Sequence, residues 1–173
     1  MSRVFIGVGS NIDPETNILD ALSFLAHYSK IKGISTFYRT SPIDRPDQAP
    51  FINGVIEIQT ALTPANLKHI LRQIESELGR IRTDDKYASR PIDLDILVYD
   101  DLIISSPELT IPDPDIGNRA FVAIPLCELA PDLIIPGWGE SICHIAKRLE
   151  ANGMEPLIEF TELLRHRSVL PLS

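Results

Sequence analysis

Two aspartates stand one residue apart in the stretch SRPIDLDILVYD, residues 89–100. Apolar and β-branched residues alternate through this stretch, which predicts a strand. On a strand, Asp93 and Asp95 share one face about 6–7 Å apart, where two carboxylates repel each other by about 2–3 kcal/mol at an effective dielectric constant of about 20. Either solvent screens the pair at a strand end or a cation lies between the carboxylates. Magnesium fits the second case, because it binds one or two carboxylates together with substrate phosphates.

Four cationic side chains precede the aspartates within eleven residues: Arg80, Arg82, Lys86 and Arg90. They are a quarter of the 16 lysines and arginines in a chain whose net charge is −8. A solvated charged loop would explain the cluster taken alone. Beside two carboxylates, the cluster instead favours a site that binds and transfers phosphoryl groups. Neither GxxxxGK[ST] nor GxGxxG occurs, and we interpret GVGSN at 7–11 as a tight turn after the first strand.

The composition restricts the class of protein. With 173 residues, of which 44% are hydrophobic and 23% charged, the chain is typical of a single globular domain. The negative net charge argues against nucleic acid as a partner, and no apolar run approaches the roughly 18 residues of a membrane span. Cys127 and Cys143 form no CxxC pair, so we expect two reduced cysteines in a cytoplasmic protein.

The predicted site must be positioned by strands and helices that alternate along the chain. Strands are expected at residues 3–9, 33–40, 51–60 and 92–98. Helices are expected after an N-cap at Asp13, from Thr63 to Gly79, at 120–130, from 140 to Gly153, and in a short piece near 159–164. This order predicts a layered α/β or α+β sheet domain. The polar loops 41–50 and 83–89 are expected to close over bound substrates and exclude water.

Several longer landmarks follow one another between residue 4 and about residue 136. They are GVGSN at 7–11, FYRTSPI at 37–43, FINGVIEIQT at 51–60, IESELGRIR at 74–82, SRPIDLDIL at 89–97 and IPDPDIGNRAFVAIPLCELAPDL at 111–133. With these landmarks the chain resembles the hydroxymethyldihydropterin pyrophosphokinase family of folate biosynthesis. The resemblance implies an α+β fold, with a ferredoxin-like core sheet and helices packed on it in three α/β/α layers. It also implies transfer of pyrophosphate from ATP to the hydroxymethyl group of 6-hydroxymethyl-7,8-dihydropterin, with release of AMP.

The resemblance further implies roles for the matching positions. Asp93 and Asp95 would bind two magnesium ions, and Arg80 and Arg90 would stabilise the charge that moves during transfer. The nucleotide-side positions are Arg72, Glu75, Arg82, Lys86, Ile96, Asp113 and Arg119. The pterin-pocket positions are Thr40, Ile43, Phe51, Asn53 and Phe121. The two phenylalanines would sandwich the flat ring and the Asn53 amide would pair with its edge, although each phenylalanine taken alone would be interpreted as a core residue. The catalytic domain would cover residues 1–153, followed by an extension of unknown role at 154–173, in a monomer or weak dimer.

Some residues depart from the family's pattern. Asp113 replaces the histidine of a usual Pro-His-Pro, Arg72 stands where Gln is frequent, and Ala88 with Ser89 replaces Gly-Pro. An unpaired carboxylate at Asp113 would repel a triphosphate, so we expect a nearby cation to neutralise it, Arg72 rather than Arg119. Two alternatives stay open: a relative that binds pterin or nucleotide without turnover, and the same chemistry on a different pterin.

Overall fold

The computed structural model of the chain describes residues 1–41, 47–81, 83–85 and 88–169. Its centre is a six-stranded sheet in which β5, β1, β4, β3 and β8 are neighbours in that order and β2 also pairs with β4. All of these pairings are antiparallel. The strands are β1 (Ser2–Ser10), β2 (Lys30–Ile34), β3 (Tyr38–Thr40), β4 (Phe51–Thr60), β5 (Asp93–Tyr99) and β8 (Glu155–Pro156). A separate hairpin contains β6 (Ile104–Ser105) and β7 (Thr110–Ile111).

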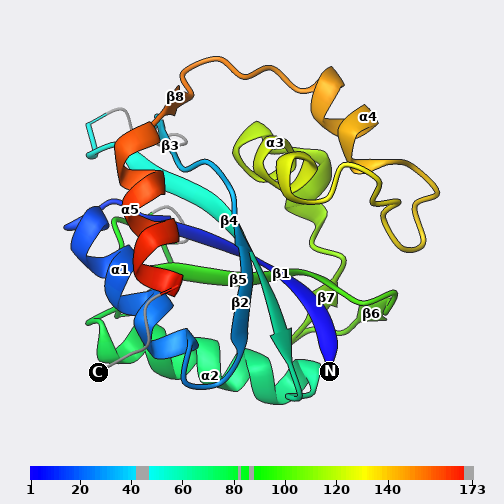
Figure 1. The fold of residues 1–173 in the computed structure, drawn as a ribbon, viewed down its shortest axis with the longest axis horizontal. Helices are drawn as coiled ribbons and strands as arrows, with labels where there is room; N and C mark the ends of the chain where they lie inside the picture. The colour runs from blue at the N-terminus through cyan, green and yellow to red at the C-terminus, as the bar shows by residue number, and fades with distance from the viewer. Residues whose placement is uncertain (42–46, 82, 86–87, 170–173) are drawn as a thin grey trace.

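Helices cover both faces of the sheet (Figure 1). One layer contains α1 (Pro14–Leu25), α2 (Pro64–Glu77) and α5 (Ile158–Val169). The other contains the 3₁₀ helix η1 (Pro114–Gly117), α3 (Ala120–Leu129) and α4 (Ile142–Arg148). The expected α+β fold with a ferredoxin-like sheet between two helical layers is confirmed. In the part of the chain that the structure describes, no helix has both the length and the apolar character needed to cross a membrane.

The inner strand β1 contributes side chains to two hydrophobic cores, one on each face of the sheet. Val4, Ile6 and Val8 are buried with α1, α2 and α5, whereas Phe5 is buried with α3 and α4. Because successive side chains of a strand point to opposite faces, a strand covered on both sides is apolar almost throughout. β1 pairs with β4 from Ser2↔Thr60 to Ser10↔Ile52. This long register decides which side chains face which helical layer.

The strand expected at 33–40 is divided into β2 and β3, which both pair with β4. Between them, the Ser35 N–H donates to Val55 O at 2.9 Å, and the Ser35 hydroxyl accepts from the Val55 N–H at 2.9 Å. The ring of Phe37 lies against Gly54, where an added Cβ would approach it to 2.4 Å. The chain therefore leaves the ladder for three residues in order to bury Phe37.

Two other local expectations were wrong. GVGSN is no tight turn, since residues 7–10 continue β1. Asp13, by contrast, is the N-cap residue of α1, which begins at Pro14 as expected, although its φ is 40° and its side chain makes no capping hydrogen bond. α4 ends at Arg148 instead of Gly153, because Leu149 adopts an extended backbone (φ −93°, ψ 138°) and packs against the core under α3 and α4.

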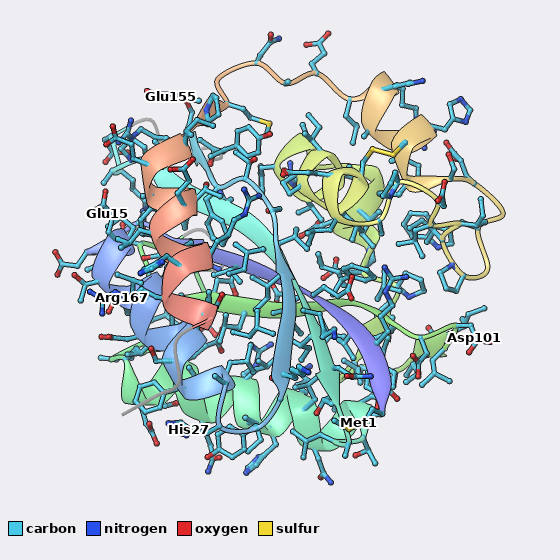
Figure 2. The ribbon with its side chains drawn as sticks, in the orientation of Figure 1. Met1, Glu15, His27, Asp101, Glu155 and Arg167 are labelled. Atoms are coloured by element: carbon cyan, nitrogen blue, oxygen red, sulfur yellow. A yellow bond between two sulfur atoms is a disulfide. The ribbon has the colours of Figure 1, made fainter. Side chains whose placement is uncertain are left out.

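The segment after residue 153 packs on the sheet. β8, which begins at Glu155, pairs with β3, and α5 lies beside α1. Figure 2 labels Glu155 at the start of β8 and Arg167 in the last turn of α5. The Phe160 ring meets the Phe37 ring edge-on at a centroid distance of 6.1 Å. Thr161 Oγ1 accepts from the Phe37 N–H at 2.9 Å. Residues on both sides of the proposed boundary at 153 thus share one core.

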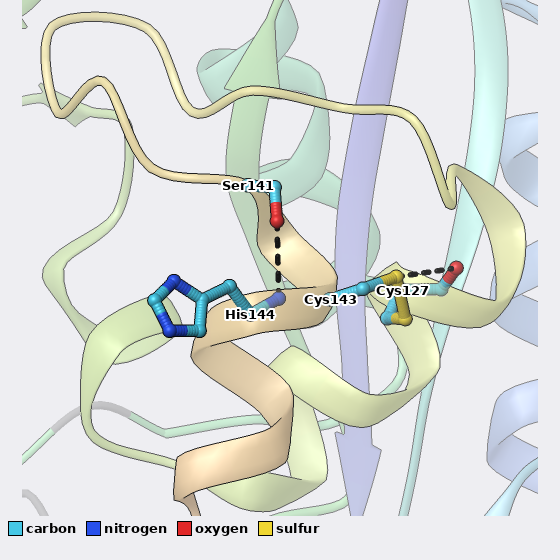
Figure 3. The surroundings of a disulfide bond; sticks show 4 residues. All are labelled: Cys127, Ser141, Cys143 and His144. Carbon is cyan, nitrogen blue, oxygen red and sulfur yellow. Dashed lines mark hydrogen bonds between the residues drawn. A yellow bond between two sulfur atoms is a disulfide. The ribbon is translucent and has the colours of Figure 1, made fainter.

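The two cysteines form a disulfide between α3 and α4 (Figure 3). The expectation of two reduced cysteines was therefore wrong. Helix packing brings the Cα atoms of Cys127 and Cys143 to 5.0 Å, within the usual range for a disulfide. Ser141 caps α4 by accepting from the His144 N–H at 3.1 Å, which positions the first turn that carries Cys143. A separation of 16 residues gives no local sign of this pairing.

Candidate active site

One face of the sheet forms the floor of the candidate site. The register places Gly9 of β1 between Asn53 of β4 and Asp93 of β5, and Gly7 opposite Asp95. Directly opposed residues of antiparallel strands present their side chains on the same face. Asn53 and the two aspartates therefore lie on the same face of the sheet. Between them runs β1, which has no side chain on this face at Gly7 and Gly9.

Gly9 leaves the space that the Asn53 side chain occupies. A Cβ at residue 9 would lie 2.5 Å from Oδ1 of Asn53. Above these glycines lies a cavity of about 490 Å³, a volume typical of small-molecule sites. Eleven of the residues expected at the site line this cavity: Thr40, Phe51, Asn53, Arg72, Arg80, Arg90, Asp93, Asp95, Asp113, Arg119 and Phe121.

Asp93 and Asp95 have different surroundings within the cavity. Asp93 accepts from Arg80 Nη1 at 2.8 Å and from Arg90 Nη1 at 3.2 Å. Among the described residues, Asp95 forms no ion pair. Burial raises the pKa of Asp95 well above its usual range, the carboxylates of Asp93 and Asp113 raise this pKa further, and Arg72 partly offsets them. Asp95 is thus the carboxylate whose charge is least compensated.

Glu75 on α2 lies beneath the cavity and is only 1% exposed. Its Oε2 accepts from Arg80 Nη1 at 2.6 Å and from the Leu94 N–H at 2.9 Å, and its Oε1 accepts from Arg72 Nη1 at 2.7 Å. Glu75 itself lines neither this cavity nor the smaller one beside it. In this structure it orients two arginines that do line the larger cavity.

Asp113 lies at the start of η1, where its Oδ1 accepts from the Asp115 N–H at 2.8 Å. Burial raises the pKa of Asp113 to about 6; the hydrogen bond from Asp115 opposes this rise, and the carboxylates of Asp115 and Asp93 add to it. The expected ion pair with Arg72 is not formed, because Arg72 binds Glu75 at 2.7 Å. Glu75 lies three residues further along the same helix and its buried carboxylate needs a partner, so it holds Arg72 away from Asp113.

The pterin-pocket positions that the structure describes line the same cavity from β3, β4 and α3. Asn53 Nδ2 donates to Thr40 Oγ1 at 2.7 Å. The guanidinium carbon of Arg90 lies 6.0 Å from the centre of the Phe51 ring. Phe51 and Phe121 are half-buried and line the cavity, and Phe121 also packs against the core under α3 and α4. Two half-buried rings and a side-chain amide therefore face the same space as the carboxylates.

Of Ile96 and Arg119, only Arg119 lines the larger cavity. Ile96 points to the opposite core and lines the smaller cavity, of about 140 Å³, together with Arg72 and Asp113. Arg119 directly precedes α3 as its N-cap residue. Three further positions lie outside the described residues: Ile43, Arg82 and Lys86.

Sequence reasoning missed Gly9 and Asn11. Two glycines two residues apart on a strand leave one face without side chains, and this signal was present in GVGSN. Asn11 follows the end of β1, is 5% exposed, and accepts from the Arg90 N–H at 2.7 Å. A buried polar residue at a strand end has such partners as a rule, but the sequence does not say which they are.

Comparison with known proteins identifies the family. The sequence profile of 7,8-dihydro-6-hydroxymethylpterin-pyrophosphokinase (HPPK) matches residues 5–131. The chain belongs to the HPPK family. All residues that line the larger cavity, from Gly7 to Val122, lie within the matched HPPK range.

Full-length relatives and solved structures agree with this assignment. The 2-amino-4-hydroxy-6-hydroxymethyldihydropteridine pyrophosphokinase of Methylorubrum extorquens is 37% identical over 158 residues, which are 90% of this chain and 98% of the relative. The Haemophilus influenzae protein of the same name is 39% identical over 157 residues, 89% of this chain and 97% of the relative. The structure of Plasmodium falciparum HPPK-DHPS A437G with SDX-DHP matches with a TM-score of 0.70 at 14% identity, over 85% of this chain and 45% of that longer chain. At this identity the structural match concerns the HPPK fold alone.

Proposed function

We propose that the protein transfers pyrophosphate from ATP to the hydroxymethyl group of 6-hydroxymethyl-7,8-dihydropterin. The hydroxyl oxygen attacks the β-phosphorus and gives up its proton to solvent. The bond between the β-phosphorus and the oxygen that it shares with the α-phosphorus breaks, and AMP leaves with that oxygen. The observation that carries the proposal is one cavity that combines a carboxylate pair and two arginines with two half-buried rings and an amide. Phosphoryl transfer and flat-ring recognition need these two sets of groups side by side.

We propose that Asp93 and Asp95 hold magnesium, two ions by analogy with the family. The donor set fits, because hard oxygen ligands suit magnesium and because the charge of Asp95 lacks a partner among the described residues. In that part of the chain, no group of three or more His, Cys, Asp or Glu side chains is arranged to hold a metal, so substrate phosphates and water would complete the coordination. When bound, magnesium neutralises phosphate charge and orients the reacting oxygens.

Arg80 and Arg90 are proposed to stabilise the charge that develops on the transferred group. Each guanidinium lies beside Asp93 at 2.8 and 3.2 Å. Both are only partly exposed, with 11% and 15% of the side-chain surface accessible, which strengthens their interaction with phosphate relative to an exposed site. Glu75 keeps Arg80 in place before substrate arrives. Preorganised charge of this kind lowers the barrier without reorganisation during the reaction.

The pterin would bind between Phe51 and Phe121, with its polar edge toward Asn53. The Asn53 amide offers one acceptor and two donors, and one of those donors is already directed to Thr40. Backbone groups of Thr40 and Ile43 would complete the pocket. The nucleotide would lie toward α2 and η1, next to Arg72, Asp113 and Arg119. Ile96 would contact it from β5, and Glu75 would orient Arg72 and Arg80 without touching it. Arg82 and Lys86 are the other proposed nucleotide-binding residues.

The site is assembled from residues of one chain, so we expect a monomer or weak dimer. We also place the reaction in the cytoplasm, because ATP is the co-substrate. The Cys127–Cys143 disulfide would there be exposed to cellular thiols. We propose no nucleic-acid or membrane partner.

The decisive experiment follows AMP and diphosphorylated pterin in parallel, with the purified chain, ATP, magnesium and 6-hydroxymethyl-7,8-dihydropterin. We expect both products in equal amounts, and none when the pterin is omitted or EDTA is added. Calorimetric binding of both substrates without AMP would establish a binding protein. Turnover of only a differently substituted reduced pterin would establish the same chemistry on another substrate.

A further inference from the structure

Asn11 joins three segments at the edge of the cavity. Its Oδ1 accepts from the Arg90 N–H at 2.7 Å, and its own backbone N–H donates to Arg90 O at 3.1 Å. Its Nδ2 donates to Ala49 O at 3.2 Å and to Ser89 Oγ at 3.3 Å. Ala49 is the last residue but one of the polar loop 41–50, and Ser89 ends the polar loop 83–89.

The side chain of Asn11 meets its hydrogen-bonding requirements through these contacts. A primary amide has one oxygen acceptor and two N–H donors, and each has a partner here. The residue is 5% exposed, so water could not replace a lost partner without rearrangement. Aspartate would keep the acceptor and lose both donors, whereas alanine would lose all three contacts.

Arg90 is the residue most directly controlled by this arrangement. Both its backbone N–H and its backbone oxygen bind Asn11, so the start of its side chain is fixed. Its guanidinium then extends to Asp93 at 3.2 Å and lies 6.0 Å from the Phe51 ring centre. Small displacements of a charged group cost much of its effect on a transition state.

We propose that Asn11 is a positioning residue, which holds Arg90 between Asp93 and Phe51 and ties together the ends of the two polar loops. Nothing in the reaction requires Asn11 to touch a substrate. Ser89 stands where the family usually has proline, so the Asn11–Ser89 contact is a feature of this chain. The inference rests on the proposed function, because turnover is one of its two readouts.

The test is a double-mutant cycle in kcat with Asn11→Ala and Arg90→Ala. If Asn11 acts through Arg90, Asn11→Ala lowers kcat by about tenfold in the wild-type background. In the Arg90→Ala background it lowers kcat by less than about twofold, because the residue it positions is gone. Equal fold losses in both backgrounds, or a folded Asn11→Ala protein with wild-type kcat, would overturn the proposal.

Matched variants separate positioning from general disturbance. Asn17→Ala removes a side-chain amide that donates to Ile12 O at 2.6 Å outside the cavity, and we expect it to leave kcat unchanged. Ser89→Ala removes one of the Nδ2 partners and keeps the contact to Arg90, so it should lower kcat less than Asn11→Ala does. Loss of activity in Asn17→Ala equal to that in Asn11→Ala would count against a specific role.

Amide hydrogen exchange gives a readout that does not depend on turnover. The Arg90 N–H should exchange slowly in the wild type and in Asn11→Asp, which retains the acceptor, and at least about tenfold faster in Asn11→Ala. Asn11→Asp also serves if the alanine variant fails to fold, since fast exchange at Arg90 in a folded Asn11→Asp protein would contradict the assigned contact. If the wild type released no AMP, the proposed function would be refuted. If Arg90→Ala kept full activity, the role of Arg90 would be refuted. In both cases the exchange rate of the Arg90 N–H would still decide whether Asn11 holds Arg90.

Discussion

Arg72 donates from Nη1 to Oε1 of Glu75 at 2.7 Å, one turn along the same helix. This contact takes the cation that was expected to neutralise Asp113. Glu75 has 2% of its side-chain surface exposed, and a buried carboxylate holds its partners firmly because losing them leaves an uncompensated charge. Arg72 and Asp113 therefore act on the cavity from separate positions.

Independent action predicts additive effects of Arg72→Gln and Asp113→Asn on ATP binding. Arg72→Gln should weaken binding by about 1 kcal/mol, since a cation that lines the cavity is lost. Asp113→Asn should strengthen it, since a carboxylate is lost. The change in binding free energy of the double variant should equal the sum of the two single changes within about 0.5 kcal/mol. Calorimetry with a non-hydrolysable ATP analogue measures these free energies. Arg39→Gln, which removes an exposed pair with Glu155, is the control. A coupling above about 1 kcal/mol would mean that the two residues meet when nucleotide is bound.

Asp95→Asn should abolish AMP release while the fold is retained. The substitution removes a proposed metal ligand, and it also relieves repulsion with Asp93 and Asp113. The melting temperature should hold or rise by a few degrees, as about 1 kcal/mol corresponds to roughly 2–4 °C in a chain of this size. Asp101→Asn, on an exposed residue outside the cavity, should change neither quantity. AMP release near the wild-type rate in Asp95→Asn would sink the metal assignment.

The raised pKa of Asp113 predicts a pH-dependent effect of Asp113→Asn on stability. The pKa is about 6 in the folded state, against a reference value of 3.8. Between these values the folded state binds more protons than the unfolded state, so this group's contribution to stability falls as pH rises through the interval. Asparagine does not titrate, so it removes this dependence of stability on pH, and its side-chain oxygen still accepts from the Asp115 N–H. The free energy of unfolding of the variant, relative to that of the wild type, should therefore rise by on the order of 1 kcal/mol from pH 4 to pH 7, after allowance for solvent screening. Urea unfolding at several pH values measures the difference, and a difference independent of pH would contradict the shifted pKa.

The disulfide predicts stability that depends on reductant. Its cysteines are 16 residues apart, and closing a loop of that length stabilises by about 3 kcal/mol in the chain-entropy account. Dithiothreitol should lower the melting temperature of the wild type by several degrees and leave a Cys127→Ser/Cys143→Ser variant unaffected. We expect kcat at 25 °C to change little, because Val122 and Ala123 are buried in the core and should hold the start of α3 in place. Two free thiols in the unreduced, denatured wild type would rule the disulfide out.

Local pattern was sufficient for most of the fold. Alternating residues in β4 and β5 and the Thr63–Pro64 start of α2 predicted elements that the structure confirms. The same kind of evidence was misleading at residues 33–40, where the packing of Phe37 against Gly54 divides the strand. A tertiary contact there overrides the local preference for a continuous strand.

For the site, the sequence by itself determined which chemical groups are present and that Asp93 and Asp95 share a face, because the two-residue period of a strand is a local property. Only the tertiary structure decided that Gly9 separates Asp93 from Asn53, that Arg72 binds Glu75 and leaves Asp113, that Asn11 holds Arg90, and that Cys127 meets Cys143. These pairings depend on strand order, register and helix packing, which bring together residues far apart in the chain. Spacing along a sequence carries no information about such distances, so the partners of each charged group followed from the fold alone.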